Sequence, residues 1–279
     1  MLSDGAWGTQ LQARGLPPGA CPDLWNLTHP EKVREVPRAY VAAGAQIVLT
    51  NTFGANRLRL AETGAADQVG AINEAGARIS CEEAGANAFV FASMGPSGKL
   101  LISEDVTEAE LHDAFTEQAL ALARGGAHGL VVETMQDLDE ARIAIAAAKT
   151  TGLPIVASMV FDSGKEKDRT MFGVTPEQAA AALVEAGADV IGANCGQGIA
   201  GFVSICARLK AAAGGRPIWI KANAGLPEMH VGKATYVMTA AEFAGYVPAL
   251  ISAGANFIGG CCGTTPEFIR EVHRQLHPN

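Results

Sequence analysis

The sequence has few aromatic residues, few cysteines and no long apolar run, and each shortage excludes a class of protein. Phenylalanine, tryptophan and tyrosine make up 6% of the 279 residues. Six cysteines are too sparse in a chain of this length for a disulfide scaffold, so we expect reduced thiols. No segment reaches the roughly 18 apolar residues of a membrane span. The first residues, MLSDG, lack the basic and apolar parts of a signal peptide. We therefore expect a cytoplasmic protein that does not enter a membrane.

Dense basic segments are also missing. The formal net charge is -8, and Lys and Arg form no run of the kind that binds nucleic acid. Nucleic acid is therefore not expected as a partner. The sequence gives no indication of the oligomeric state.

Glycine and alanine are abundant, and one short pattern repeats along the chain. A helix-like stretch ends in glycine, a few residues follow, and an apolar strand begins. Glycine ends helices well because it takes the left-handed conformation without a penalty from a Cβ atom. The glycines in this position are Gly44, Gly85, Gly126, Gly152, Gly187, Gly215 and Gly254. The strands expected after them cover residues 46–53, 89–94, 129–135, 154–161, 190–195, 217–222 and 257–261.

With an opening strand at residues 1–5, the pattern gives eight strands that alternate with helices. Capping boxes at Thr107, Thr175 and Thr239 mark three of the helix starts. The strands are continuous apolar runs, such as LVVET and IWIKA, which is typical of parallel strands buried on both faces. Eight such units without a linker predict one domain over residues 1–279 with the α/β, (β/α)8 TIM-barrel fold.

Unusual residues stand where the expected strands end, which is where the active sites of such barrels lie. Cys195 ends the sixth strand, and Cys261 and Cys262 stand at the end of the eighth. Because only the seventh strand lies between these two, we expect the three thiols to meet on one rim. Three thiolates form a strong Zn²⁺ site with one open position. Buried apolar cysteines are the alternative, and they would be favoured for an isolated pair. The cysteines that receive no site role are Cys21, Cys81 and Cys206.

The adjacent pair raises a geometric difficulty, because neighbouring residues on a regular strand point to opposite faces of the sheet. Three glycines, Gly259, Gly260 and Gly263, flank Cys261 and Cys262. We expect them to let the backbone leave strand geometry, so that both thiols can reach one ion.

Asp4 and Glu133 are carboxylates at the ends of apolar strands, where burial is costly unless the charge is paired. Two roles are open at this point. They bind the ammonium group of a substrate, or they form structural ion pairs inside the rim, with Lys221 as the obvious partner.

The run from Gly196 to Gly201, GQGIAG, fits the dinucleotide-binding pattern GxGxxG. The next strand, however, ends in Lys221 rather than in an acidic residue, and the pattern belongs to open-sheet folds. We expect these glycines to let the chain turn beside Cys195 instead.

Taken together, these motifs resemble those of the homocysteine S-methyltransferases. That family includes the homocysteine domain of cobalamin-dependent methionine synthase and the betaine–homocysteine methyltransferases. The segments that carry the resemblance are Asp4-Gly5-Ala6-Trp7-Gly8-Thr9, Trp25-Asn26, Asn51-Thr52-Phe53-Gly54, Asn194-Cys195-Gly196 and Gly259-Gly260-Cys261-Cys262-Gly263-Thr264.

The resemblance implies a zinc-dependent methyltransferase in which Cys195, Cys261 and Cys262 hold the metal and take part in catalysis. In the implied reaction the sulfur of homocysteine takes the open zinc position and loses its proton. It then attacks an electrophilic methyl group to give methionine.

The resemblance also implies a substrate-binding set. Asp4, Gly5 and Glu133 would bind the amino acid part of homocysteine. Asn223 would lie near the metal and fill the open position when substrate is absent. Trp7 stands where methionine or a smaller residue is usual, and Ala222 replaces a frequent proline.

The methyl donor is left open by the sequence. The chain has no room for folate or cobalamin domains, so a methylcorrinoid would have to arrive on a separate protein. Otherwise the donor is a small onium compound such as betaine, which the general patterning favours. Trp7 at the rim would then stack on the cation, unless it only packs there. Two other functions are kept: a Schiff-base lyase that uses Lys221, and a non-catalytic zinc- or thiol-binding protein that docks on a corrinoid protein.

Overall fold

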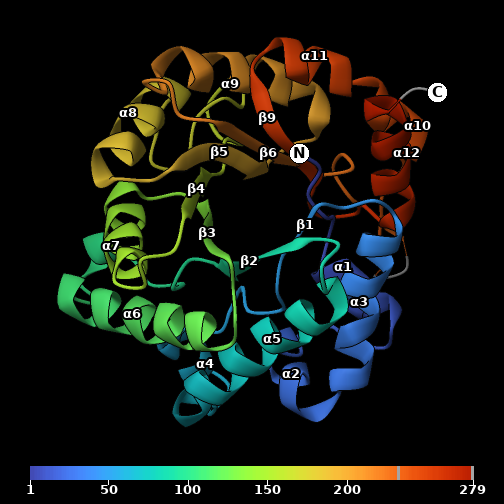
Figure 1. Ribbon diagram of the computed structural model, residues 1–279. Coiled ribbons are helices and arrows are strands. Elements are labelled where there is room, and N and C mark those ends of the chain that lie inside the picture. The colour runs from blue at the N-terminus through green and yellow to red at the C-terminus, as the bar shows by residue number, and fades with distance from the viewer. Residues whose placement is uncertain (231–232, 278–279) are drawn as a thin grey trace.

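A curled parallel sheet surrounded by helices forms the body of the protein (Figure 1). The computed structural model describes residues 1–230 and 233–277. The strands of the main sheet lie in the order β1-β2-β3-β4-β5-β6-β9 and are all parallel, while β7 and β8 form a separate antiparallel hairpin. The strands are β1 (Ile47–Val48), β2 (Phe89–Met94), β3 (Gly129–Met135), β4 (Ile155–Met159), β5 (Val190–Cys195), β6 (Ile218–Ala222), β7 (Glu228–His230), β8 (Lys233–Thr235) and β9 (Ala255–Gly260).

Helices between successive strands pack on the outside of the sheet (Figure 1). The α-helices are α1 (Gly8–Ala13), α2 (Trp25–Thr28), α3 (Pro30–Ala42), α4 (Arg57–Ala61), α5 (Val69–Ala84), α6 (Glu108–Arg124), α7 (Leu138–Lys149), α8 (Pro176–Ala186), α9 (Ile199–Ala212), α10 (Ala240–Gly245), α11 (Val247–Ser252) and α12 (Pro266–Leu276). The 3-10 helices are η1 (Pro22–Leu24), η2 (Ala66–Gln68) and η3 (Leu101–Ser103). No helix in the described part of the chain is long and apolar enough to cross a membrane.

The sequence predicted a closed eight-stranded barrel, but the described residues form a curled, TIM-barrel-like sheet of seven parallel strands whose edge strands β1 and β9 do not pair. The opening strand expected at residues 1–5 is reduced to two isolated bridges. Leu2 pairs with Ile258 of β9, and Ser3 pairs with Ile47 of β1. The chain has room for little more pairing there, because it passes through Gly5 and enters α1 within a few residues.

The local signals for helix ends are confirmed. All seven glycines expected to end helices have positive φ, between 51° and 105°. The capping boxes at Thr107, Thr175 and Thr239 are all formed. These signals are reliable because they depend on a few adjacent residues and not on the rest of the fold.

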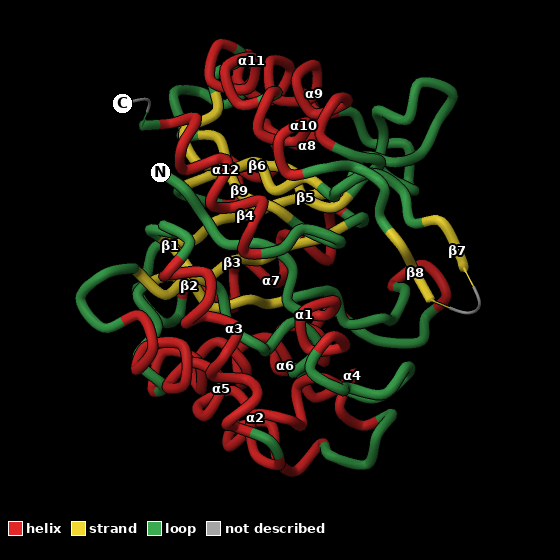
Figure 2. Tube along the Cα trace, turned by 90° about the vertical axis from the view of Figure 1, so that its right-hand side faces the viewer, coloured by secondary structure: helices red, strands yellow, loops and turns green. Residues whose placement is uncertain are grey.

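Strand register sets the position of the expected site. Cys195 at the end of β5 pairs with Ala222 of β6, and Ala222 pairs with Gly260 of β9. Three strand ends are therefore level, and the chain leaves β9 directly into Cys261. This edge lies on the side of the β7–β8 hairpin, whereas the N-terminus lies at the opposite end (Figure 2).

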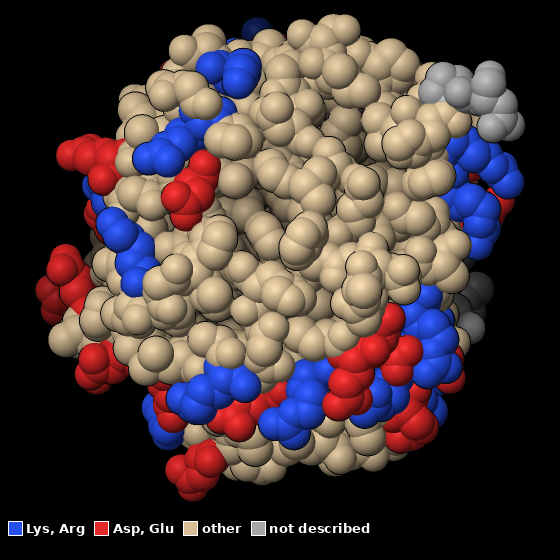
Figure 3. Space-filling view, viewed as in Figure 1, with Lys and Arg blue, Asp and Glu red and all other residues tan. Residues whose placement is uncertain are grey.

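The face seen in Figure 3 is the end of the molecule on which the N-terminus lies. Lys, Arg, Asp and Glu gather around its margin, and its centre is largely uncharged. Among the described residues that this view shows, no continuous basic surface crosses the face.

Candidate metal centre and substrate cavity

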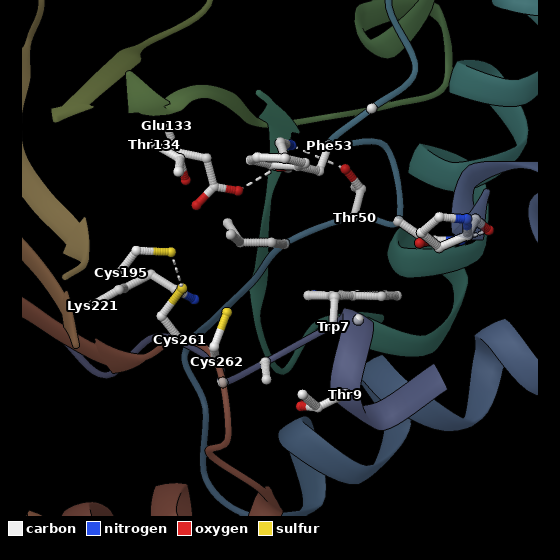
Figure 4. A pocket seen from close by; sticks show the side chains of 18 of the residues that line it. Trp7, Thr9, Thr50, Phe53, Glu133, Thr134, Cys195, Lys221, Cys261 and Cys262 are labelled. Carbon is white, nitrogen blue, oxygen red and sulfur yellow. Dashed lines mark hydrogen bonds between the residues drawn. The ribbon is translucent and has the colours of Figure 1, made fainter. Parts of the chain in front are cut away.

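Three thiols converge at the level carboxyl ends of β5 and β9, as the sequence predicted. The Sγ atoms of Cys195 and Cys261 are 3.1 Å apart. With Cys262, the three ligand atoms all lie within 4.8 Å of one another, and each side chain is partly buried. Figure 4 shows the three sulfur atoms facing one space. All six cysteines are free thiols.

The backbone bends sharply on both sides of the cluster. Cys195 has a φ of 62°, which is unusual for a residue with a side chain, and the following Gly196 has a φ of 67°. This confirms that the glycine-rich run lets the chain turn beside Cys195. The chain then enters α9 at Ile199. The turn accounts for these glycines without a dinucleotide-binding role.

Cys261 and Cys262 both face the space beside Cys195, as expected, but only one of the three flanking glycines changes the direction of the backbone. Gly259 and Gly260 are still part of β9, so they do not break the strand. The change of direction comes after the strand, where Gly263 has a φ of 81°. A Cβ atom on Gly263 would lie 2.3 Å from the ring of Tyr236, so glycine is needed there for space as well as for conformation.

The three thiols titrate very unevenly. Hydrogen bonds from Cys195 and Cys261 lower the pKa of Cys262 to about 3. The pKa of Cys195 is raised well above that of a free thiol, by its hydrogen bonds to Cys261 and Cys262 and then by burial. For Cys261, the hydrogen bond with Cys195 lowers the pKa. The hydrogen bond to Cys262, burial and the negative charge of Cys262 outweigh this effect and raise the pKa to about 12. One negative charge is thus shared by the cluster, and a divalent cation would release the remaining protons.

Asp4 is held in a structural ion pair, which is one of the two roles left open by the sequence. Its carboxylate contacts the ammonium of Lys221, and both side chains are almost completely buried. The other carboxylate oxygen accepts hydrogen bonds from Trp7 Nε1 at 2.9 Å and from the backbone N–H of Leu49 at 2.8 Å. The ammonium of Lys221 also donates to Ser3 Oγ at 3.1 Å. Both oxygens of Asp4 are therefore occupied.

Glu133 lies near the carboxyl end of β3 and, unlike Asp4, faces the open space. It accepts a hydrogen bond from the hydroxyl of Ser93. Burial and then the negative charge of Cys261 raise its pKa to about 7, although Lys221 and Ser93 oppose the shift. Its place on the strand is fixed one residue later, where the Asn194 amide exchanges hydrogen bonds with Thr134 at 2.7 and 2.9 Å.

Asn223 lies immediately after β6, beside the thiols. Its side-chain N–H donates to the carbonyl of Gly196 at 2.8 Å, which fixes the orientation of the amide. The side-chain oxygen is buried and has no hydrogen-bond partner among the described residues. An oriented oxygen without a partner is an available ligand atom.

A cavity of about 380 Å³ opens above the thiols. Gly5, Trp7, Glu133 and all three cysteines line it, whereas Asp4 and Asn223 are not among the described residues on its wall. In Figure 4 the ring of Trp7 lies on the far side of Cys262 from Cys195, and the ring of Phe53 lies near Glu133. The side chains on the wall that carry charge or an aromatic ring are Trp7, Asp23, Phe53, Arg59, Glu133 and Lys221.

Asp23 and Arg59 are cavity residues that the sequence did not reveal. Asp23 is buried, and burial raises its pKa to about 6, although a hydrogen bond from the backbone N–H of Gly54 opposes the shift. The segment that carries it is tied down by an exchange between two amides. Asn26 donates to the carbonyl of Asn51 at 2.7 Å, and Asn51 donates to the side-chain oxygen of Asn26 at 2.9 Å. The sequence analysis identified Asn26 and Asn51 as motif residues, but it did not show that they hold the segment that carries Asp23.

The chain is similar to known proteins over nearly all of its length. It is 34% identical to methionine synthase of Mycobacterium tuberculosis over 293 aligned positions, which cover 98% of this chain but 24% of that protein. It is 29% identical to betaine–homocysteine S-methyltransferase 1 of Mus musculus, and the match covers 100% of this chain and 72% of that protein. The chain therefore spans about a quarter of the length of the methionine synthase.

Solved structures show the same fold. The metallated form of the homocysteine methyltransferase MmuM from Escherichia coli superposes with a TM-score of 0.79 at 23% identity. The match covers 98% of this chain and 94% of that one. The family model described as homocysteine S-methyltransferase matches residues 1–276, and on this evidence the chain belongs to the homocysteine S-methyltransferase family.

Proposed function

We propose that this protein is a zinc-dependent homocysteine S-methyltransferase that forms methionine. The observation that carries the proposal is the group of three thiols at the base of a cavity, with all ligand atoms within 4.8 Å of one another. Three protein ligands and one open position are typical of catalytic zinc, and thiolates are ligands that zinc prefers. The relatives named as methionine synthase and betaine–homocysteine methyltransferase support the same acceptor and product.

The residues present fit a zinc ion. Cys195, Cys261 and Cys262 would hold it, and the side-chain oxygen of Asn223 supports an oxygen ligand in the substrate-free protein, because it is buried, oriented and unpartnered. When bound, zinc would act as a Lewis acid that lowers the pKa of a substrate thiol from near 8.5.

The amino acid part of homocysteine would lie along the wall opposite Trp7. Glu133 is suited to accept its ammonium, because it faces the cavity and has a hydroxyl rather than a cation as its close partner. Asp4 would act through Lys221 and Trp7, which it orients by the contacts described above. Gly5 belongs to the same wall, and a Cβ atom there would lie 2.7 Å from Tyr40 Oη and from Thr264 Oγ1.

The chemical step needs orientation more than proton transfer by the protein. The thiolate of homocysteine attacks the methyl carbon, the new S–C bond forms, and the electron pair of the broken bond leaves with the donor atom. The cavity wall would hold both reactants in line and limit the access of water. This positioning would accelerate methyl transfer without a general base.

The proposed donor is a small onium compound. The cavity lies at the small end of the range for ligand sites, which suits two small molecules better than homocysteine with a folate. Aromatic side chains at Trp7 and Phe53 suit a cation. A methylcorrinoid brought by a separate protein is the second candidate, favoured by the 34% identity to a methionine synthase.

Two other functions have less support. A Schiff-base lyase would need the amine of Lys221 as a nucleophile, but that group is buried and engaged by Asp4 and Ser3. A non-catalytic zinc- or thiol-binding protein would use the same thiol cluster and the same Glu133, so only methyl transfer separates it from the enzyme.

The proposal also includes a closed barrel. The bridges from Leu2 to β9 and from Ser3 to β1 support the N-terminal segment as the eighth strand of a (β/α)8 barrel. That position brings Asp4 to the carboxyl end of β6, where Lys221 stands.

The test is a panel of methyl donors supplied with homocysteine to the zinc-loaded protein, with methionine as the readout and bound zinc measured in parallel. Methionine from at least one donor, lost when zinc is removed, is the expected result. Bound zinc and homocysteine without methionine from any donor would support the non-catalytic alternative. Protein without affinity for zinc would refute the proposal.

A further inference from the structure

Cys261 and Cys262 belong to one tight turn that follows β9. The backbone N–H of Thr264 donates to the carbonyl of Cys261 at 3.1 Å, which closes the turn. Gly263 is the third residue of the turn, and its φ of 81° is typical of that position in a type II turn. The conformation of this turn sets the directions in which the two adjacent thiols point. Whatever holds the turn therefore also positions these thiols.

The ring of Tyr236 packs against this turn from outside the cavity. A Cβ atom on Gly263 would lie 2.3, 2.4 and 2.6 Å from the Cγ, Cδ1 and Cδ2 atoms of Tyr236. Cys261 and Cys262 line the cavity, whereas Tyr236 is not among the described residues on its wall. Tyr236 is partly buried and packs instead against the main hydrophobic core. The ring therefore supports the turn without contact with the contents of the cavity.

Tyr236 stands near the end of a segment that begins beside the thiols. The segment connects β6 to α10 and contains the β7–β8 hairpin, which lies on the side of the carboxyl ends of the strands (Figure 2). Before the hairpin, the backbone N–H of Ala224 donates to the carbonyl of Cys262 at 3.0 Å. After the hairpin, Tyr236 directly follows β8 and contacts Gly263. The segment thus holds the turn from both sides of the hairpin.

The same segment also contacts the turn that carries Cys195. The backbone N–H of Asn223 donates to the carbonyl of Cys195 at 3.4 Å. A Cβ atom on Gly198 would lie 3.1 Å from the Cα atom of Gly225, so the two backbones pack closely there. One segment therefore joins the two turns from which all three thiols project.

We propose that Tyr236 is a positioning residue for the metal centre, because its ring holds Gly263 in the conformation that directs Cys261 and Cys262 at one ion. This inference rests on the proposed function, which assigns the thiols to zinc. Adjacent side chains on an extended backbone point apart, so their convergence needs one defined backbone path. The ring fills the space into which the turn would otherwise relax. Without it, metal binding would have to order the turn, which costs conformational entropy.

The experiment measures metal binding separately from the stability of the fold. Competition with a chelator gives zinc retention, and the absorption spectrum of the cobalt-substituted protein reports the geometry of the site. Urea denaturation of the metal-free protein gives stability. The variants are Tyr236→Ala, Tyr236→Leu and Tyr236→Phe. Tyr246→Ala is the matched control, because Tyr246 is also partly buried against the main core but lies at the start of α11.

We expect Tyr236→Ala to weaken zinc retention on the order of tenfold to a hundredfold, as for loss of a group that holds a metal ligand in place. The cobalt bands should shift in the same variant, because the thiolates no longer converge on one point. Tyr236→Leu should show a smaller loss in the same direction. Tyr236→Phe keeps the ring and should match the wild type in both measurements. Tyr246→Ala should lower the urea midpoint and leave metal binding unchanged.

Gly263→Ala tests the same contact from the other side. The added methyl group would collide with the ring of Tyr236 and would strain a residue at positive φ, so zinc retention should fall. In the double variant with Tyr236→Ala the collision is gone and only the strain remains. The double variant should therefore lose less than the sum of the two single losses. Additive losses would show that the ring does not act through the turn.

Three further results would overturn the inference while leaving the proposed function intact. One is wild-type zinc retention with an unchanged cobalt spectrum in Tyr236→Ala. Another is an equal loss in Tyr236→Phe, which would assign the effect to the hydroxyl and not to the ring. The third is an equal loss of zinc in Tyr246→Ala, which would reduce Tyr236 to a general contribution to packing. A wild type that binds neither zinc nor cobalt would count against the proposed function itself.

Discussion

The ammonium of Lys221 contacts the carboxylate of Asp4 at the base of the cavity, and neither side chain is more than 2% exposed. Breaking a buried pair by removing one partner leaves the other charge without compensation. We therefore expect Asp4→Asn and Lys221→Met each to lower the free energy of unfolding by about 3–5 kcal/mol.

The measurement is urea denaturation of the two single variants and the double variant. The double variant should lose less than the sum of the single losses, because it leaves no unpaired charge. Additive losses would show that the two side chains are not coupled, contrary to their contact in the structure.

The thiol cluster predicts a sharp division among the cysteines. Cys261→Ala should abolish zinc retention and turnover, because two thiolates and water hold zinc much less tightly than three thiolates. Cys206→Ala is the control: it removes a buried thiol from α9, far from any ligand role, and should keep about one zinc per chain. Metal content after dialysis and methionine formation are the two measurements. A Cys261→Ala protein that still turns over would refute the assignment of the ligands.

Much of the fold could be predicted because its signals are local. The glycines at helix ends and the three capping boxes depend on adjacent residues, and the level strand ends that gather Cys195 and Cys261 follow from the parallel topology. The hairpin β7–β8 was missed. It pairs two three-residue strands at residues 228–230 and 233–235, too short for a recognisable alternation of apolar and polar residues.

The cavity wall was less predictable for a different reason. Asp23 reaches the cavity because Asn26 and Asn51 exchange hydrogen bonds across 25 residues of sequence. Arg59 reaches the cavity from α4, which no spacing reveals. For Asp4, the sequence allowed a substrate contact or an ion pair with Lys221, and the structure shows the ion pair.

Glu133 predicts a pH dependence of stability with a definite sign. Burial raises its pKa from 4.5 to about 7 in the folded protein. Between these values the folded state keeps a proton that the unfolded chain has lost, so stability falls as the pH rises from about 4.5 to about 7, by at most about 3 kcal/mol. Glu133→Gln should flatten this slope. Urea midpoints of the metal-free wild type and variant across that range provide the measurement, and equal slopes would contradict the shift.

The same residue should govern homocysteine binding in the opposite sense. A substrate ammonium favours the ionised carboxylate, so homocysteine should bind more tightly as the pH rises towards 7, with release of a proton below that value. Glu133→Gln should raise KM for homocysteine on the order of tenfold or more and remove the carboxylate's part of this dependence, which leaves only the proton lost by the substrate thiol. Calorimetry in buffers of different ionisation enthalpy would count the protons released below pH 7, and equal numbers for wild type and variant would argue against an ammonium contact.

Asn223 makes a prediction that separates the resting protein from the substrate complex. Its side-chain oxygen is buried without a partner among the described residues, while its N–H is fixed to the carbonyl of Gly196. If this oxygen fills the open zinc position at rest, Asn223→Ala should weaken zinc retention by about tenfold without homocysteine, as for loss of an ordered ligand contact. With homocysteine present the sulfur would replace the oxygen, so wild type and variant should retain zinc equally. Competition with a chelator, with and without homocysteine, measures both states. A defect of the same size in both would assign Asn223 a structural role beside Gly196 instead.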